Sequence, residues 1–251
     1  MAQRHAPLIA LLTDFNTTEW YTGCLKGVIL TICPQARLVD ITHQIPPQDI
    51  TAGAVTLAQA APWVPPKTIF ACVVDPGVGS ARALIAAQAD GQMFVGPDNG
   101  VLSLVLQRAK RRQLVRLTNR AYWLPTVSQT FQGRDILAPV SAHVARGCPL
   151  SRLGERATHY RTVQLPPLRK IPQGVRGCLL LIDAFGNLIT NIPASLLARS
   201  AHAAVRYHRT RVRVVSSYAQ GRRGELIALA ASSGYVELAL REASAAKRYH
   251  A

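Results

Sequence analysis

Short apolar runs alternate with stretches of helical periodicity along the first two-thirds of the chain. The apolar runs at residues 8–12, 37–41 and 68–74 predict strands. Between them, residues 21–32 and 50–61 carry apolar side chains at helical spacing and predict helices. Strands and helices that alternate in this way are typical of an α/β domain with a mainly parallel sheet.

The pattern changes after a proline-rich stretch. Residues 166–174 interrupt the periodicity and predict a semi-rigid linker, because proline fixes the backbone and removes a hydrogen-bond donor. Short apolar runs separated by Gly or Ser turns follow, and they predict a smaller, mainly β domain. These runs are 178–183, 205–207, 211–215, 226–230 and 236–240. We therefore expect an α/β domain at 1–165 and a β domain at 175–251.

The composition narrows the class of protein. Hydrophobic residues make up 49% of the 251 residues, which is enough for a buried core and excludes a disordered chain. No apolar run approaches the ~18 residues of a membrane span, and the N-terminal apolar stretch is short for a secretory signal. We expect a soluble, cytoplasmic protein that does not bind a membrane. Five scattered cysteines and seven histidines form no metal motif, so no metal site is predicted.

The chain is strongly basic, with a formal net charge of +16. Such a field suits nucleic acid, acidic surfaces or anionic ligands. The densest basic runs, 108–112 and 206–213, lack the aromatic and glycine pattern of an RNA-binding sheet. Basic surface faces are therefore the favoured interpretation. Nucleic-acid binding is kept as a minor alternative, which predicts affinity that falls steeply with salt.

Two carboxylates follow predicted strands, and ligands gather at the carboxyl ends of strands in α/β sheets. Asp14 ends the first strand and Asp75 the third. Two glycines after Asp75 permit a tight turn, and Arg82 is close enough in sequence to fold back onto it. No Gly-Lys-Ser/Thr follows, which argues against a nucleotide-triphosphate loop. These residues fit a functional pair and a surface Asp–Arg pair equally well.

Two further segments carry polar side chains. Gln132 and Asp135 precede a predicted helix, where Asp135 is placed to cap it or to face its positive end. In the second domain, Asp183, Phe185 and Asn187 follow a strand. An aromatic face beside an amide suits purine recognition, and a decorated β-turn fits the same residues.

Eight segments, taken in order, resemble one known family, the S-adenosyl-L-methionine (SAM) hydrolases. These enzymes are also called SAM hydroxide adenosyltransferases and are relatives of the fluorinase and chlorinase. The segments are Thr13-Asp-Phe, Tyr21-x-Gly-x-x-Lys-Gly27, Val39-Asp-Ile-Thr-His43, Val74-Asp-Pro-Gly-Val-Gly-Ser80 with Arg82, Gly96-Pro-Asp-Asn-Gly100, Phe131-x-Gly-Arg-Asp135, Asp183-x-Phe-Gly-Asn187 with Thr190-Asn191, and Ser233-Gly-Tyr235. The resemblance spans nearly the whole chain.

The resemblance implies a fold, an assembly and a reaction. It implies an α/β N-terminal domain, a β-barrel-like C-terminal domain and a homotrimer that binds SAM where two neighbouring subunits meet. Water attacks ribose C5′ and displaces methionine, which gives adenosine and L-methionine. SAM is then the substrate, and no cofactor is expected.

The resemblance also assigns substrate contacts. Asp14 is expected to bind the ribose hydroxyls. The expected contacts from the second domain are Asp183, Phe185, Asn187, Ser233 and Tyr235. Two residues near the site depart from the family pattern, since Asn16 stands in place of a glycine and Glu19 in place of an aspartate.

The expected catalytic residues are Asp75, Arg82 and Gln132. Asp75 and Arg82 match two members of the family's Asp-Arg-His triad, which handles the water, and Gln132 stands where the histidine is expected. Glutamine can orient a water molecule but cannot take its proton at neutral pH. We therefore expect a slower hydrolase. The alternative is a protein that binds SAM or adenosine without turnover.

Halide transfer is a further, less favoured alternative on the same scaffold. A halide nucleophile needs a pocket without a nearby anion, because like charges repel strongly at low dielectric. The halogenases have a non-acidic residue in place of Asp75, and Gln48 matches the stacking tryptophan of the fluorinase. Both positions favour hydroxide over halide.

Overall fold

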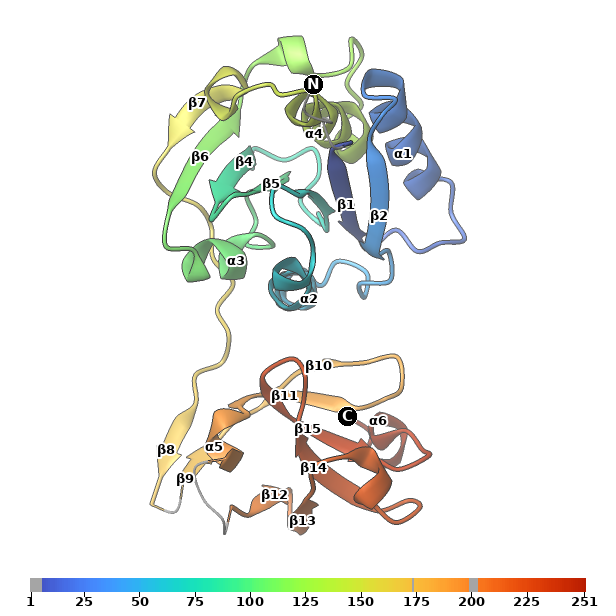
Figure 1. The fold of residues 1–251 in the computed structure, drawn as a ribbon, viewed down its shortest axis with the longest axis vertical. Coiled ribbons are helices and arrows are strands. Elements are labelled where there is room, and N and C mark those ends of the chain that lie inside the picture. The colour runs from blue at the N-terminus through green and yellow to red at the C-terminus, as the bar shows by residue number, and fades with distance from the viewer. Residues whose placement is uncertain (1–5, 173, 199–202) are drawn as a thin grey trace. The chain divides into compact units, whose positions relative to one another are not determined.

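The computed structural model describes residues 6–172, 174–198 and 203–251. The chain divides into two compact units, residues 1–163 and 164–251, drawn in Figure 1. We describe each unit separately as the first unit and the second unit.

The first unit is built on a mixed sheet in the strand order β2-β1-β3-β5-β4-β6-β7 (Figure 1). The strands are β1 (Leu8–Thr13), β2 (Arg37–Thr42), β3 (Ile69–Val73), β4 (Leu84–Ala89), β5 (Gln92–Pro97), β6 (Arg112–Leu117) and β7 (Gly154–Ala157). The ladders β2/β1, β1/β3 and β3/β5 are parallel, and the other three are antiparallel. The predicted α/β fold is confirmed.

The antiparallel half of this sheet begins at a hairpin that the hydrophobic pattern did not reveal. Strands β4 and β5 are joined by Asp90 and Gly91, whose φ angles are 45° and 87°. Two consecutive residues at positive φ form the hairpin turn that matches the natural twist of a strand pair. The Asp-Gly dipeptide at this position was the available sequence indication.

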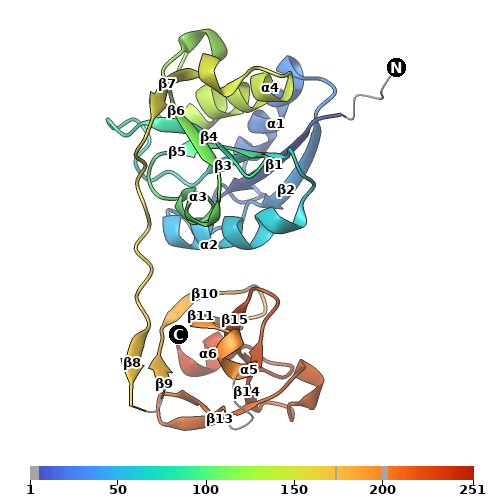
Figure 2. The same cartoon turned by 60° about the vertical axis from the view of Figure 1, so that its left-hand side comes forward.

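Helices cover both faces of the sheet (Figures 1 and 2). Helices α1 (Tyr21–Ile32) and α4 (Ala138–Ala145) lie on one face, and α2 (Ile50–Ala60) and α3 (Ser103–Arg108) on the other. Leu25 and Ile29 of α1 share a buried cluster with Val140 of α4 and Leu11 of β1. A π-helical turn (Gly133–Leu137) leads directly into α4. The first unit also has short 3₁₀ turns at Ala61–Trp63, Arg120–Tyr122 and Leu150–Arg152.

The second unit contains a curled six-stranded sheet in the order β10-β11-β15-β14-β13-β12 (Figure 1). The strands are β10 (Leu179–Ile182), β11 (Leu188–Pro193), β12 (Val205–Tyr207), β13 (Thr210–Val214), β14 (Leu226–Ala230) and β15 (Tyr235–Leu240). The short helices are α5 (Ser195–Ala198) and α6 (Ala245–Tyr249), with a 3₁₀ turn at Tyr218–Gln220. The prediction of a mainly β second domain is confirmed, although strand β11 was missed.

Part of the proline-rich stretch also has regular structure. Strand β8 (Arg169–Ile171) pairs antiparallel with β9 (Gly174–Arg176) in a separate two-stranded sheet. Within the described ranges, no helix has both the length and the apolar character needed to cross a lipid bilayer.

Candidate active site

The structure brings Asp75, Arg82 and Gln132 together. The Nε of Arg82 donates to Oδ1 of Asp75 at 2.6 Å. Its Nη2 donates both to the other carboxylate oxygen of Asp75 and to Oε1 of Gln132, the latter at 2.8 Å. The side chains of Asp75 and Arg82 are only 7% and 5% exposed. The pair is therefore a buried ion pair, and the alternative of a surface Asp–Arg pair is wrong.

Two glycines allow the segments that carry these residues to approach their neighbours closely. Gly79 has a φ of 81°, and a Cβ there would lie 2.7 Å from the carbonyl oxygen of Gln129. A Cβ on Gly133 would lie 2.9 Å from Cγ1 of Val73 in β3. Cores have no spare volume for such atoms. The loop after β3 and the π-helical turn thus reach these positions because both residues lack a side chain.

Of the two positions predicted for Asp135, the cap is wrong, because no side chain caps the π-helical turn. Asp135 lies in the first turn of this segment, which agrees with the other alternative. The fully buried Asp135 accepts hydrogen bonds from Nε of Arg134 at 2.6 Å and from the backbone N–H of Ser128 at 2.8 Å. The Arg134 guanidinium also lies 5.0 Å from the ring centre of Phe131. Through its hydrogen bond to Ser128, Asp135 therefore connects the preceding loop to the π-helical turn, which begins directly after Gln132.

Asp14 lies at the same sheet edge as Asp75, as expected for two residues that follow adjacent parallel strands. Its Oδ2 accepts a hydrogen bond from the backbone N–H of Gln48 at 2.8 Å. Burial raises the pKa of the Asp14 carboxyl above its ordinary value, and the negative charge of Asp75 acts in the same direction. The two carboxylates are thus close enough to influence each other.

Several motif residues support this edge. Oγ1 of Thr13 lies 2.9 Å from Nδ1 of the buried His43, which ties the ends of β1 and β2 together. Asn16 has a φ of 65°, and its N–H donates to the carbonyl of His43 at 2.7 Å. Asparagine tolerates this left-handed conformation, which explains how it replaces glycine. Asn99 donates to the carbonyl of Val74 at 2.8 Å, directly before Asp75.

Sequence reasoning missed an aromatic cluster beside these residues. The ring centres of Phe15, Trp20 and Tyr21 lie 5.7, 5.8 and 5.2 Å from that of Phe131. Trp20 is 58% exposed. Phe15 follows Asp14 and Phe131 precedes Gln132, so the rings come from two segments that are far apart in the sequence. Their contact depends on the tertiary fold and could not be read from either segment alone.

In the second unit, Asp183, Phe185 and Asn187 form the turn between β10 and β11. The Asp183 carboxylate accepts from the backbone N–H groups of Phe185 and Asn187 at 2.9 and 2.8 Å, and from Nδ2 of Asn187 at 2.9 Å. The Phe185 ring is 80% exposed. The turn thus fixes a carboxylate and an amide and presents a bare aromatic face.

Ser233 and Tyr235 lie at the opposite end of the same ladder. Tyr235 pairs with Pro193 at the end of β11, whereas the Asp183 turn adjoins Leu188 at its start. The β11 segment between them is irregular, and their partners on β15 are three residues apart, about 10 Å at the usual rise of a strand. Ser233 and Tyr235 are therefore separated from the Asp183 turn along this ladder.

Glu237 and Tyr218 were not predicted and lie near the Asp183 turn. The Tyr218 hydroxyl donates to Oε1 of Glu237 at 2.6 Å, and Glu237 is 4% exposed. Burial raises the pKa of the Glu237 carboxyl, and the charge of Asp183 contributes in the same direction. A glutamate within an apolar strand was the available indication in the sequence.

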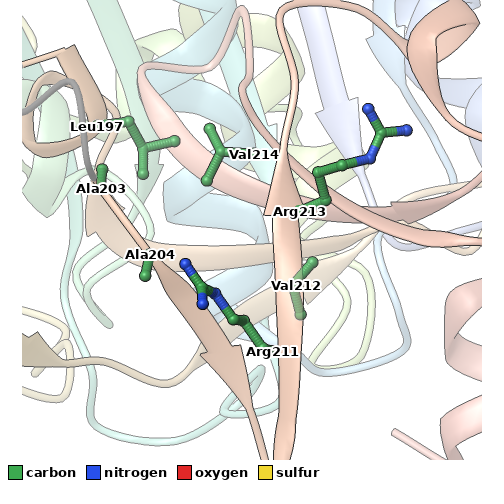
Figure 3. Close-up of a pocket in the computed structure, with 7 residues that line it drawn as sticks. All are labelled: Leu197, Ala203, Ala204, Arg211, Val212, Arg213 and Val214. Carbon is green, nitrogen blue, oxygen red and sulfur yellow. The ribbon is translucent and has the colours of Figure 1, made fainter.

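A hollow of 660 Å³ in the second unit contains none of the predicted site residues. It is lined by Leu197, Ala203, Ala204, Arg211, Val212, Arg213 and Val214 (Figure 3). The guanidinium of Arg213 pairs with Glu225, with an Nε–Oε1 distance of 2.9 Å. We assign no ligand to this hollow.

Over the parts of the chain that the structure describes, no three His, Cys, Asp or Glu side chains are grouped so that they could hold a metal ion. The arrangement in the first unit consists of carboxylates, a guanidinium and an amide. These groups can bind hydroxyls and orient a water molecule through hydrogen bonds.

Comparison with known proteins identifies the same two units. Residues 9–154 match the model of the SAM hydroxide adenosyltransferase N-terminal domain, and residues 177–251 match that of its C-terminal domain. The chain is 37% identical over 243 residues to a protein of Salinispora tropica named (R)-S-adenosyl-L-methionine hydrolase, covering 96% of this chain and 92% of the relative.

Two further comparisons agree with this result. The chain is 29% identical to a fluorinase of an Actinoplanes species, over 74% of this chain and 72% of that protein. The crystal structure of an uncharacterized conserved protein from Thermotoga maritima superimposes with a TM-score of 0.91 at 34% identity, covering 97% and 96% of the two chains. The chain therefore belongs to the SAM hydroxide adenosyltransferase family.

Proposed function

We propose that this protein hydrolyses SAM to adenosine and L-methionine, with Asp75, Arg82 and Gln132 positioning the attacking water. The buried hydrogen-bonded chain formed by these three residues beside Asp14 carries the proposal. The relatives of 33–37% identity that are named as hydrolases support it.

In the proposed step, the water oxygen forms a bond to ribose C5′ while the bond from C5′ to sulfur breaks. The electron pair of that bond goes to sulfur, which leaves as the neutral thioether of methionine. The leaving group therefore needs no general acid. The proton lost by water passes to the Asp75 carboxylate and then to solvent. Arg82 holds that carboxylate in place through its hydrogen bonds to both oxygens.

The remaining residues bind the substrate in this proposal. Asp14 accepts hydrogen bonds from the ribose hydroxyls. In the second unit, the bare ring of Phe185 and the amide of Asn187 suit the adenine base, and the carboxylate of Asp183 helps to hold the substrate. Ser233 and Tyr235 are the further contacts that the family resemblance assigns.

Gln132 sets the expected rate. Alignment of the reacting atoms contributes up to ~7–11 kcal/mol in favourable systems, and it needs no proton acceptor at position 132. A missing general base typically costs ~10²–10⁴-fold in rate. Turnover is therefore retained but is slower than that of relatives with histidine at this position.

The proposal includes a homotrimer that binds SAM between neighbouring subunits. The assignment of substrate contacts to both units is consistent with such a shared site. Light scattering of the purified protein is expected to give three times the chain mass of 27.2 kDa. A monomeric mass together with full activity would contradict the shared site.

The test is incubation of the purified protein with SAM, followed by chromatographic measurement of adenosine and methionine. The two products are expected in equal amounts. Both epimers at sulfur are assayed separately, because the curated relatives are named for the (R) form, and we expect the (R) epimer to be preferred. Asp75→Asn is expected to abolish most of the activity, while Glu155→Gln on the edge strand β7 retains it.

Two outcomes would overturn the proposal. Tight binding of SAM that is recovered unchanged after long incubation would identify a binding protein without turnover. This alternative is considered because Gln132 replaces the histidine of the family. Product formation that depends on chloride or fluoride would identify halide transfer. Halide transfer is not expected, because Asp75 places a negative charge where a halide would have to bind.

A further inference from the structure

A second cavity lies in the first unit. Its volume is 580 Å³, within the ~300–1,000 Å³ of typical small-molecule sites. Arg82 and Gln132 form part of its wall, but Asp14 and Asp75 do not. The rest of the wall comes from the start of β4, the end of β6 and the loop before the π-helical turn. None of the residues proposed above to bind the substrate lines this cavity.

The charged side chains of the wall are all arginines, and one of them, Arg82, is already paired with Asp75. Arg82, Arg116 and Arg120 line the cavity, and no aspartate or glutamate does. Glu155 of β7 lies opposite Arg116 in the β6/β7 ladder, but among the described residues neither Arg116 nor Arg120 forms an ion pair, and Nη1 of Arg82 has no acceptor. Three guanidinium groups around one hollow favour an anionic ligand, because guanidinium groups bind carboxylates and phosphates in bidentate fashion.

One residue of the wall, Trp123, has a buried hydrogen-bond donor without an acceptor. The indole Nε1 of Trp123 is buried and has no partner in the structure. Leaving such a donor unpaired costs about 1–3 kcal/mol, so each case calls for an explanation such as a bound group. Trp123 lines the cavity, and the guanidinium of Arg120 lies 5.6 Å from its ring centre.

Much of the remaining lining is apolar. Leu84, Leu124, Val127 and Ile136 contribute aliphatic surface beside the arginines. An inorganic ion would leave this surface uncovered, whereas a ligand with an apolar body would bury it. The cavity therefore combines an anion-binding wall with room for a small hydrophobic group.

We propose that this cavity binds a small organic anion with an apolar body and a single carboxylate, sulfonate or phosphate group. The anionic group pairs with the arginines, and the body covers the aliphatic wall. Arg82 belongs both to this cavity and to the Asp75–Gln132 arrangement, so a bound anion draws its guanidinium away from those partners. The ligand is thus an inhibitor of hydrolysis, a consequence that rests on the proposed function.

Binding is tested first without any activity measurement. The purified protein is titrated with 8-anilinonaphthalene-1-sulfonate, an organic anion whose fluorescence rises when it binds. We expect Arg116→Ala and Arg120→Ala each to weaken binding about tenfold or more, the loss for a hydrogen bond to a charged group. Arg37→Ala, an exposed arginine on the far strand β2, is the matched control and is expected to bind like the wild type.

Competition distinguishes this cavity from the substrate site and defines the ligand class. Adenosine at saturation is expected not to displace the dye. Inorganic phosphate, which lacks an apolar body, is expected to displace it at least tenfold less effectively than naphthalene-1-sulfonate. Displacement by adenosine, or equal potency of phosphate and the sulfonate, would overturn the assignment. Unchanged affinity in both arginine variants, with melting temperatures like that of the wild type, would do the same.

The inhibitory part is tested by steady-state kinetics. Naphthalene-1-sulfonate is expected to lower kcat with little change in KM for SAM, and Arg120→Ala is expected to relieve the inhibition. Inhibition that raises only KM, or that persists in Arg120→Ala, would refute this part. If the wild type lacks hydrolase activity but its dye binding depends on the arginines, the proposed function is wrong and the proposed anion site is supported. The two proposals can therefore be tested separately.

Discussion

The Nη2 of Arg82 donates to Oε1 of Gln132 at 2.8 Å, and this contact determines how the glutamine amide is turned. A guanidinium has only donors, so the oxygen of the amide must face Arg82 and its NH₂ group must face the other way. Gln132 can therefore donate a hydrogen bond from its NH₂ group to a water molecule, but it cannot accept a proton from that water. In the proposed reaction, the proton is accepted by Asp75, which is the carboxylate in this hydrogen-bonded chain.

Replacing the glutamine by the family's residue tests this assignment. Gln132→His places an imidazole beside Arg82 and is expected to raise kcat by about 10²-fold, at the lower end of what a general base contributes. The gain is expected only at pH values where the imidazole is neutral, measured by adenosine release across pH. Gln132→Asn provides a control of similar polarity. A histidine variant no faster than the wild type would show that position 132 takes no proton.

The buried ion pair predicts a strong effect on stability. Asp75→Ala leaves the Arg82 guanidinium buried without its partner, which is expected to lower the free energy of unfolding by about 3–5 kcal/mol. The double variant Asp75→Ala/Arg82→Ala is expected to lose less than the sum of the single variants. Urea titrations measure all three. Lys26→Ala, which breaks the exposed pair with Asp40, is the control and is expected to cost at most about 1 kcal/mol.

Replacing Asp14 by asparagine is expected to stabilise the folded chain in a way that depends on pH. Its pKa is raised in the folded chain, so ionisation of this carboxyl opposes folding, and stability falls as pH rises through the folded pKa. Asp14→Asn keeps an oxygen that can accept from the N–H of Gln48 and removes the charge. The variant is expected to melt at a higher temperature than the wild type at pH 7, and the difference is expected to disappear below the ordinary pKa.

The same substitution is expected to weaken SAM binding. A melting temperature at pH 7 equal to or below that of the wild type would contradict the electrostatic argument. Enhanced stability together with lost affinity would identify Asp14 as a residue kept for binding at a cost in stability.

The contact between Gly133 and Val73 predicts a steric effect with a specific rescue. Gly133→Ala places a methyl group 2.9 Å from Cγ1 of Val73 and is expected to cost about 1–3 kcal/mol and much of the activity. Val73→Ala in the same chain is expected to restore activity in part, because it removes the clashing atom. Thermal melting and adenosine release are measured together.

The matched control for this prediction is Gly23→Ala. A Cβ at this position in α1 meets no atom within 4 Å, so the change is expected to stabilise the chain by about 0.5–1 kcal/mol. Loss of activity in Gly133→Ala that Val73→Ala leaves unchanged would place the cause elsewhere than in this contact.

Local sequence patterns predicted the helices and strands more completely than they predicted the geometry of the candidate active site. The helix expected at 21–32 has those bounds, and the helix expected at 50–61 ends one residue earlier, because their spacing reflects one buried face. The π-helical turn before α4 could not be predicted in this way. It depends on the approach of Gly133 to β3, which is a contact between segments 60 residues apart.

Residue identity indicated the site's members but not all of its geometry. The burial of the Asp75–Arg82 pair depends on packing from distant segments, so the sequence left a surface pair open. The separation of Ser233 from the Asp183 turn follows from the register between β11 and β15. Register is a property of long-range pairing and is not visible in either strand alone.

The π-helical turn has a consequence for changes of chain length. The N–H of Ala138 donates to the carbonyl of Gly133, five positions earlier, where an α-helix would use four. Deleting one residue inside this turn would restore ordinary α-helical winding and rotate the preceding segment by about 100° around the helix axis. Helix α4 would stay on its face of the sheet while the amide of Gln132 swung away from Arg82. A single-codon deletion is therefore sufficient to disconnect the glutamine from the ion pair.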